Sequence, residues 1–408
     1  MSTSEHLSEV DSLYSWMRLA ASLAVATVGG IGLWSVVVIM PSIEAEFGIG
    51  RGEASIPYTA TMVGLALGGL IMGRLSDRFG IFPPLIGASL VLGGGYIAAA
   101  QAPSLTLFNI VQAGMIGMLG SSIAFGPLVA DITHWFEKRR GLAVAVVASG
   151  NYLSGTVWPP IISWGVATYG WRDTYSGVGI ACIVLLLPLA FLLRRRPDFE
   201  GRAKLGEKPQ HPMPFGASPR AIQLLLVLAG LACCIAMSMP QVHIVAYCGD
   251  LGYGVARGAE MLSIMLALGI VSRLASGFIA DKIGGLGTLL LGSGLQCLAL
   301  VFYIPFDGLT SLYIVSAIFG LSQGGIVPSY ALVVRKFFPA HEAGTRVSMV
   351  LMSTVIGMAV GGWMSGEIFD LTGSYRAAFL NGIGWNLLNM SIAFWLLLGS
   401  RRKVPVAV

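Results

Sequence analysis

The chain has 408 residues, of which 55% are hydrophobic and only 11% are charged. A soluble domain carries about 25% charged residues, so this chain lacks the charge that would cover a globular surface. The net charge of +5 would suit an anionic partner, but the placement of the basic residues accounts for it without nucleic acid. The composition therefore excludes a soluble globular protein and indicates a membrane protein.

Apolar segments long enough to cross a membrane recur along the whole chain. A helix needs about 20 apolar residues to cross a hydrocarbon core about 30 Å thick. Charge-free runs of this size are Leu19–Ile43, Ala54–Gly73, Phe79–Ala130, Gly141–Trp171, Thr174–Leu193, Ala221–Gly249, Ile283–Phe306, Leu309–Val334, Val347–Gly366 and Ala377–Ser400. The third run holds two helices with a turn at Ala102-Pro103-Ser104, and Met261–Ala280 adds a span that carries Arg273. The sequence thus predicts twelve transmembrane helices.

The basic residues set the expected orientation. With the N-terminus inside the cell, twenty Lys and Arg residues fall on the cytoplasmic side, one lies in the membrane and four fall outside: Arg51, Arg172, Arg257 and Arg376. This distribution obeys the positive-inside rule. The first eighteen residues are polar and rather acidic, with Arg18 just before the first helix. They do not resemble the basic start of a signal peptide, so the first helix is expected to stay attached.

A polar stretch, residues 194–220, follows the sixth expected helix. Its arginines and prolines are typical of a linker. We therefore expect five segments: a cytoplasmic tail (1–18), a six-helix half (19–193), a cytoplasmic linker (194–220), a second six-helix half (221–400) and a cytoplasmic tail (401–408).

The two halves resemble each other at a constant offset of 204 residues. The matches are Gly73-x-x-x-Asp77-Arg78-x-Gly80 with Gly277-x-x-x-Asp281-Lys282-x-Gly284, Glu46-Phe47-Gly48 with Asp250-Leu251-Gly252, and Trp171-Arg172 with Tyr375-Arg376. Three matches at one offset indicate an internal repeat. Two six-helix repeats about an axis along the membrane normal are typical of facilitator-type transporters.

The first of these repeated elements resembles the loop motif of the major facilitator superfamily, which lies between helices 2 and 3 and between helices 8 and 9. The resemblance implies an all-α fold of twelve transmembrane helices in two halves, with this motif in gating. Its glycines are expected to allow tight turns and close helix approach, and its Asp to accept from helix N-terminal amides. The alternative is a solvated turn. Family members usually continue with basic residues, whereas Ile81-Phe82-Pro83 and Gly285-Leu286 follow here.

Arg273 is the only Lys or Arg well inside an expected span. An ionisable residue in lipid costs about 2.5–3.5 kcal/mol or more and marks a functional site by default. If its helix begins near Gly258, Arg273 lies about 22 Å along the axis, near or somewhat past the bilayer middle, where facilitator substrates bind. A guanidinium is always protonated, and its planar fork matches a carboxylate. Arg273 is therefore the candidate substrate-binding residue, and a structural ion pair is the alternative.

Two titratable residues, His243 and Asp250, lie late in the seventh expected helix. A histidine can change charge near neutral pH, and a desolvated carboxylate can take up a proton. Both are candidates for proton coupling. The alternatives are a hydrogen-bonded packing histidine and an interfacial acid that begins the outer loop, as expected for Glu46. Asp131, close to His134, is expected to belong to a cytoplasmic charge cluster.

A narrower resemblance is to the monocarboxylate transporter family. His134-Trp135-Phe136-Glu137-Lys138-Arg139-Arg140-Gly141-Leu142-Ala143 is similar to that family's loop between helices 4 and 5 and the start of its helix 5. The segments 243–252 and 272–277 resemble helices 7 and 8 of its bacterial members. In those members the helix 8 Arg holds the substrate carboxylate, and an acid near the end of helix 7 is associated with proton coupling. The resemblance implies these roles for Arg273 and Asp250. Gly269 stands where animal members often have an Asp, so that intrahelical pair is missing.

The oxalate–formate antiporter is also similar, but it binds a dianion with a second cation, a Lys in helix 11. Val347–Gly366 contains no Lys, Arg or His. A second substrate carboxylate would lose its hydration without finding a cation. We therefore expect proton-coupled symport of a small monocarboxylate, lactate or pyruvate in type, by a monomer in the bacterial cytoplasmic membrane. The alternative is organic-anion exchange of the oxalate–formate type.

Other function classes lack their motifs. Drug–proton antiporters often have an Arg in helix 4, where this chain has Gln112, and a Gly-Pro-x-x-Gly-Gly element in helix 5, where it has Gly155-Thr156-Val157-Trp158-Pro159-Pro160. The sequence contains no metal-ligand cluster, no Gly-x-Ser-x-Gly nucleophile elbow and no Gly-x-x-x-x-Gly-Lys-Ser/Thr phosphate loop. We therefore expect a transporter driven by a gradient, not an enzyme, with no cofactor, no metal and no obligate protein partner.

Overall fold

The computed structural model of the chain describes residues 11–124, 126–136, 139–195, 213–338 and 340–401. Within these ranges, the side chains of residues 77, 140–141, 340–345 and 401 are not described. Most of the predicted linker (196–212), parts of both predicted tails (1–10 and 402–408), and Glu137 and Lys138 of the predicted charge cluster lie outside the described residues.

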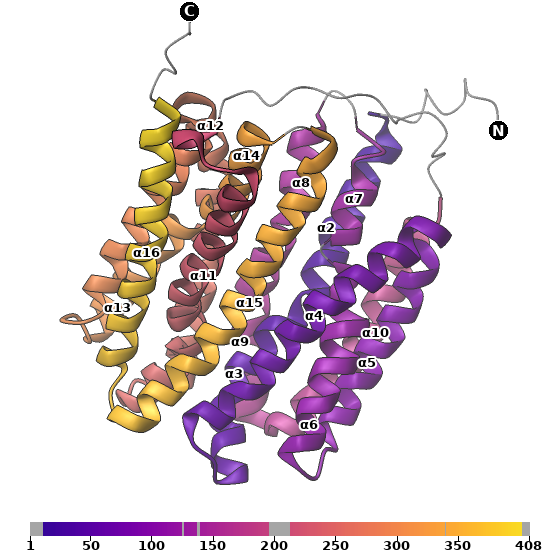
Figure 1. Cartoon of the computed structure of the whole chain (residues 1–408). Coiled ribbons are helices and arrows are strands. Elements are labelled where there is room, and N and C mark those ends of the chain that lie inside the picture. Colours follow the sequence, from indigo (N-terminus) through magenta and orange to yellow (C-terminus); the bar gives the residue numbers. More distant parts are fainter. Residues whose placement is uncertain (1–10, 125, 137–138, 196–212, 339, 402–408) are drawn as a thin grey trace, which may run out of the picture. The chain divides into compact units, whose positions relative to one another are not determined.

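Every regular element in these ranges is a helix (Figure 1), which confirms the predicted all-α class. The elements in chain order are α2 (Leu13–Gly29), α3 (Ile31–Phe47), α4 (Arg51–Phe79), α5 (Phe82–Ala100), α6 (Leu105–Val111), the π-helix η1 (Gln112–Gly120), the 3₁₀-helix η2 (Ser121–Ala124), α7 (Gly126–Ile132), α8 (Arg140–Ala148), α9 (Gly150–Tyr169), α10 (Trp171–Leu192), the 3₁₀-helix η3 (Pro214–Gly216), α11 (Pro219–Asp250), α12 (Val255–Phe302), α13 (Leu309–Gln323), α14 (Ile326–Phe337), α15 (Ala340–Thr372) and α16 (Tyr375–Arg401).

Local chemistry sets several helix ends. Ser12 and Ser104 stand just before α2 and α6, and their side chains accept hydrogen bonds from the backbone N–H groups of Ser15 and Leu107, both at 3.3 Å. Such serine caps satisfy amides that have no partner within the helix. Helix α3 ends at Phe47, and the next residue, Gly48, has a left-handed φ of 62°, which favours glycine. The predicted turn at Ala102-Pro103-Ser104 lies between α5 and α6.

Ten helical segments of the described residues are long and apolar enough to cross a membrane. One of them, α12, has 48 residues and would be about 72 Å long at about 1.5 Å per residue, more than twice a hydrocarbon core. Its backbone breaks at Gly284 (φ 75°, ψ 166°), where the eighth and ninth predicted helices should meet. The fifth predicted helix corresponds to α8 and α9, which are not among the ten. The count of twelve stays a prediction.

The chain forms two compact units. The first comprises Met1–Gly201 and Ile244–Ala267, and the second comprises Arg202–His243 and Leu268–Val408. The connected ends of α11 and α12 therefore belong to the first unit, while the remainder of these two helices belongs to the second. The predicted boundaries of the two six-helix halves, 19–193 and 221–400, stay a prediction.

A buried chain of polar side chains crosses the first unit. The hydroxyls of Ser35 and Tyr96 are 2.7 Å apart, and the Tyr175 hydroxyl donates to Ser35 at 3.3 Å. Gln112 donates to Tyr175 at 3.3 Å and accepts from Thr61 at 3.2 Å. All five residues have no exposed surface. Each hydrogen bond supplies a partner that lipid or packed side chains could not, because a buried polar group without one costs free energy.

The second unit has a comparable polar core. Tyr330 of α14 donates to the side-chain oxygen of Asn389 in α16 at 2.8 Å. Asn389 and Asn386 in turn donate to the side chain and the backbone carbonyl of Ser293 in α12, both at 2.7 Å. These contacts fix α16 against the segment of α12 that follows Gly284.

Helix α2 begins at Leu13, six residues earlier than the predicted start at Leu19, and this brings Arg18 into the helix. The Arg18 side chain is fully buried, and its Nε and Nη2 atoms each donate to Asp131 at 2.9 Å. Nη1 donates to the carbonyl of Leu193 at 3.2 Å, and the guanidinium lies 4.5 Å from the ring centre of Trp135. Asp131 thus neutralises a buried cation that ties together the helices of the first unit.

Because of this pair, replacing Asp131 by Asn should leave Arg18 buried without a counter-charge. Breaking a buried ion pair by removing one partner costs about 3–5 kcal/mol. We expect Asp131→Asn to lower the melting temperature of the purified protein clearly, measured by intrinsic fluorescence. The matched control is Asp173→Asn, which changes an exposed carboxylate in the first turn of α10. Equal melting temperatures for the two variants would contradict a stabilising role of the pair.

Candidate functional site

Arg273 lies on α12, which begins at Val255, three residues before the Gly258 assumed from the sequence. At about 1.5 Å per residue, Arg273 is therefore about 27 Å along the axis, within the segment that precedes the break at Gly284. The side chain is half-buried. Its Nε atom donates to the backbone carbonyl of Gly324, 3.4 Å away, at the junction between α13 and α14.

Two buried glutamines lie close to this junction. Gln323, the last residue of α13, has no exposed surface, and its side-chain oxygen accepts a hydrogen bond from the side chain of Gln241 on α11. Sequence reasoning missed both residues. The only signal for them is an amide within an otherwise apolar run, and that pattern also fits a structural hydrogen bond.

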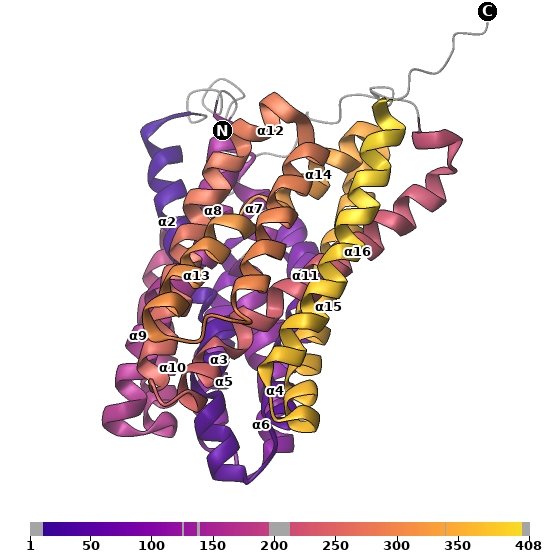
Figure 2. The same ribbon diagram turned by 90° about the vertical axis from the view of Figure 1, so that its left-hand side faces the viewer.

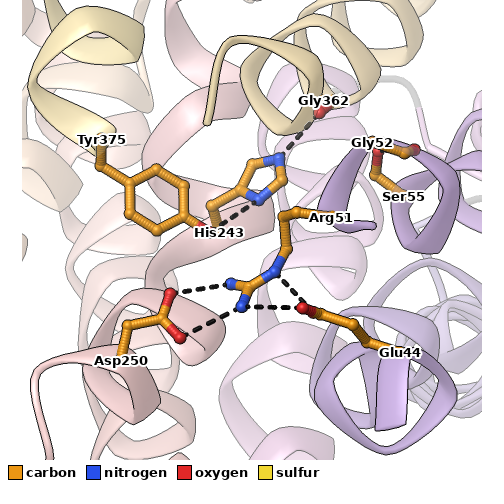
Figure 3. Close-up of polar contacts among 8 residues, drawn as sticks. All are labelled: Glu44, Arg51, Gly52, Ser55, His243, Asp250, Gly362 and Tyr375. Carbon is orange, nitrogen blue, oxygen red and sulfur yellow. Dashed lines mark hydrogen bonds and ion pairs between the residues drawn. The ribbon is translucent and has the colours of Figure 1, made fainter. Parts of the chain in front are cut away.

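Asp250, the last residue of α11, forms an ion pair with Arg51, the first residue of α4 (Figure 3). Nη1 and Nη2 of Arg51 donate to the two carboxylate oxygens of Asp250, both at 3.1 Å. A second carboxylate, that of Glu44 on α3, lies 2.6 Å from Nε of the same guanidinium. All three residues belong to the first unit.

This cluster, Glu44, Arg51 and Asp250, holds one positive and two negative formal charges. The Arg51 side chain is 6% exposed, whereas the Asp250 side chain is 36% exposed. The cation is therefore enclosed, while Asp250 is accessible to water. A guanidinium fork that meets both oxygens of a carboxylate is among the stronger polar contacts in proteins. The arrangement holds the end of α11 against the start of α4.

His243 lies two turns earlier on α11, in the second unit, and is fully buried. Its Nε2 atom lies 2.7 Å from the carbonyl oxygen of Gly362, and its Nδ1 atom lies 3.4 Å from the Tyr375 hydroxyl (Figure 3). Because a carbonyl only accepts, Nε2 carries a proton, and Nδ1 of the neutral ring then accepts from Tyr375. These are the contacts of a hydrogen-bonded packing histidine, which was the alternative to proton coupling.

We expected the repeated glycine motif to be a loop. In the structure it is instead the end of a helix and the turn that follows it. Residues 73–79 are the last two turns of α4, and Gly277, Asp281 and Lys282 lie inside α12. Gly80 (φ 79°, ψ 170°) and Gly284 (φ 75°, ψ 166°) have nearly the same backbone conformation, which favours glycine. The tight turns are thus present. The side chain of Asp77 lies outside the described part of the structure.

Close helix approach, which we also expected of this motif, is absent at its first glycine. A Cβ atom added to Gly73 or to Gly277 would meet no atom within 4 Å. Gly73 instead lines a cavity of about 160 Å³ in the first unit, together with Gly69, Gly80, Asp131 and His134. The motif therefore borders an open space next to the buried pair of Arg18 and Asp131.

The acids at one pair of equivalent repeat positions, Glu46 and Asp250, have partners that are not equivalent. Glu46 accepts from Nε of Arg172 at 3.0 Å and from Trp171 at 2.5 Å. In the first repeat, the acid at this position therefore pairs with residues of the same repeat. Asp250 occupies the repeat position of Glu46, yet it pairs with Arg51. The position equivalent to Arg51 in the second repeat is Val255. The Asp250 pair is therefore not a product of the repeat.

Sequence reasoning missed Arg51 and Glu44 as members of the site. Arg51 was counted only as one of four outer basic residues, and Glu44 was not singled out. The available signal is that Arg51 is the one cation between the first two expected helices and follows two acids, Glu44 and Glu46. Spacing could not show that its partner is Asp250, which lies 199 residues away.

The comparisons with known proteins agree with this architecture. The profile of the Major Facilitator Superfamily matches residues 22–345 and 288–407. The chain is 28% identical over 383 residues to monocarboxylate transporter 13 of Bos taurus, covering 91% of this chain and 86% of that protein. It is 25% identical to monocarboxylate transporter 11 of Mus musculus, covering 91% and 84%.

Among solved structures, a bacterial homologue of the human lysosomal transporter Spinster has a TM-score of 0.72 at 16% identity, covering 97% of this chain and all of that one. At this identity the likeness shows the fold alone. The chain is therefore an integral membrane transporter and not an enzyme, and it belongs to the Major Facilitator Superfamily.

Proposed function

We propose that this chain is a secondary transporter of small monocarboxylates, lactate or pyruvate in type, and that Arg273 binds the substrate carboxylate. The observation that carries the proposal is a permanently charged guanidinium in the membrane-crossing part of α12, half-buried and held at a backbone carbonyl. The similarity to two proteins named monocarboxylate transporters over most of the chain supports the substrate class.

The chemistry of the site favours a carboxylate. Arginine presents N–H donors in a plane, and a carboxylate accepts two of them in parallel. A charged side chain in lipid is costly, so an anionic substrate would stabilise the guanidinium as it binds. Alternating access between the two predicted six-helix halves would then carry the bound acid across the membrane, and the repeated motif at Gly80 and Gly284 would contribute the gating turns.

We further propose that transport is coupled to protons through Asp250. A carboxylate cannot both hold a proton and keep its bidentate ion pair with Arg51, so protonation and pairing exclude each other. Asp250 is partly exposed, so water can deliver the proton. Glu44 keeps Arg51 compensated when Asp250 is protonated, because it contacts the same guanidinium.

His243 is the second candidate for the proton. Its two ring nitrogens already contact Gly362 and Tyr375. A second proton on Nδ1 would require the Tyr375 hydroxyl to turn from donor to acceptor. Asp250 is partly exposed to water, whereas His243 is fully buried, and Asp250 is therefore the preferred site.

The remaining features are part of the same proposal. We place the chain in the cytoplasmic membrane of a bacterium with both termini inside, and we assign it twelve helices and a monomeric functional state. The positive-inside distribution of Lys and Arg supports the orientation.

Replacing Arg273 by Lys should reduce uptake of labelled lactate or pyruvate into proteoliposomes by about tenfold or more, because a charged hydrogen bond contributes about 1.5–3 kcal/mol. Lys keeps the charge but lacks the fork. The control is Arg257→Lys on the same helix, where the exposed Arg257 pairs with Glu260. Normal uptake in Arg273→Lys, with both variants inserted equally, would assign Arg273 to the fold instead.

Replacing Asp250 by Asn should weaken accumulation driven by a proton gradient more than equilibrium exchange of labelled acid, because Asn cannot take up a proton. The matched variant is Glu44→Gln, which removes the other carboxylate from Arg51 and leaves Asp250 intact. We expect Glu44→Gln to change both assays to a similar extent. If Asp250→Asn also lowered both equally, Asp250 would serve packing and not coupling.

A further inference from the structure

The carbonyl that contacts Arg273 belongs to Gly324, which lies in the short break between α13 and α14. Helix α14 follows α13 in the chain (Figure 2). Helix α13 ends at Gln323 and α14 begins at Ile326, with Gly324 and Gly325 between them. In a continuous helix the Gly324 carbonyl would accept from the N–H of the residue four positions later. That residue is Pro328, which has no N–H. The sequence itself therefore leaves the Gly324 carbonyl without its helical donor.

An unsatisfied carbonyl inside the hydrocarbon layer costs several kcal/mol. Nε of Arg273 lies 3.4 Å from this oxygen and donates to it. One contact thus satisfies the carbonyl freed by Pro328 and also fixes one side of the guanidinium. This contact ties Nε of Arg273 to the backbone of the α13–α14 junction.

The two glycines bring the junction close enough for this contact. A Cβ atom added to Gly324 would collide with the carbonyl oxygen of Gly269 and lie 2.5 Å from the backbone N of Arg273, and one added to Gly325 would collide with Ser276. The atoms in the way at Gly324 are backbone, which cannot rotate aside. Only glycine therefore allows the junction to approach the turn of α12 that carries Arg273.

The first repeat has no arginine at the position equivalent to Arg273, so the fold shared by the two repeats does not require the contact with the freed carbonyl. Shifted by 204 residues, Arg273 corresponds to Gly69 and Gly324 to Gly120. A Cβ added to Gly69 would meet no atom within 4 Å, so the first unit leaves open the space that the Arg273 side chain takes in the second. The cation and the freed carbonyl occur together in one repeat only, which favours a role in function over a role in the fold.

We infer that the Gly324 carbonyl, freed by Pro328, is the positioning element that orients the Arg273 guanidinium toward the substrate carboxylate. The inference rests on the proposed function of Arg273 as the carboxylate-binding residue. Gly324 and Pro328 act through Arg273 and are not assigned any contact with the substrate.

The sharpest test is Pro328→Ala, which returns an N–H to the position where the Gly324 carbonyl would accept it. The helix donor then competes with Arg273, and the guanidinium loses its fixed orientation. We expect the KM for lactate or pyruvate to rise about 2- to 10-fold, the effect of losing one hydrogen bond, with Vmax nearly unchanged. The melting temperature should not fall, because the change adds a backbone donor and Ala is a good helix former. The control is Pro188→Ala in α10, which should leave KM unchanged.

A double-mutant cycle separates this inference from the proposed function on which it rests. Binding of labelled lactate or pyruvate is measured at equilibrium for the wild type, Pro328→Ala, Arg273→Lys and the double variant. If Pro328 acts through Arg273, it should cause little further loss of affinity in the Arg273→Lys background. Fully additive losses, or wild-type affinity in Pro328→Ala alone, would overturn the positioning role while leaving the proposed function intact. Wild-type affinity in Arg273→Lys would overturn the proposed function itself.

Discussion

A polar group that a membrane protein buries must find a partner within the protein, because neither lipid nor packed apolar side chains offer one. This constraint accounts for the contacts of three arginines, which differ in what compensates them. Arg18 is enclosed with one carboxylate and an aromatic ring, and it belongs to the fold. Arg51 has two carboxylates on different helices, one of them partly exposed. Arg273 contacts a carbonyl that the helix itself cannot satisfy. In the proposed function, the first arrangement serves the fold, the second couples transport to protons, and the third binds an anion.

The internal repeat explains which features are architectural. Gly80 and Gly284 share one backbone conformation 204 residues apart, so the turn they make belongs to the common plan. The departures from the repeat are more informative about function. Asp250 pairs with Arg51, whereas its counterpart Glu46 pairs with Arg172 of the same repeat. Arg273 stands where the first repeat has a glycine. Neither Arg51 nor Arg273 has a basic residue at the equivalent position of the other repeat, where Val255 and Gly69 stand.

The sequence was sufficient for the fold class and for placing Arg273 within a long apolar helix, because both follow from the length of apolar runs and from a charge within one of them. The sequence was not sufficient where a charged side chain is buried in an ion pair. We expected the first helix to begin at Leu19, after the charged Arg18. The helix begins at Leu13 and includes Arg18, because Asp131 neutralises the buried guanidinium. The motif around Asp281 was expected in a loop because it resembles a loop motif of the superfamily, although its residues are helical. The partner of Arg51 could not be predicted, since spacing along a chain does not show which helices meet.

The central claim is that one guanidinium selects a small acid with a single carboxylate. The most direct measurement is uptake of labelled lactate or pyruvate into proteoliposomes in competition with equal concentrations of lactate, pyruvate, oxalate and succinate. The account predicts strong inhibition by the two monocarboxylates and weak inhibition by the two dicarboxylates, because a second buried carboxylate without a cation costs several kcal/mol. Stronger inhibition by oxalate or succinate than by either monocarboxylate would contradict the account and favour a dianion exchanger.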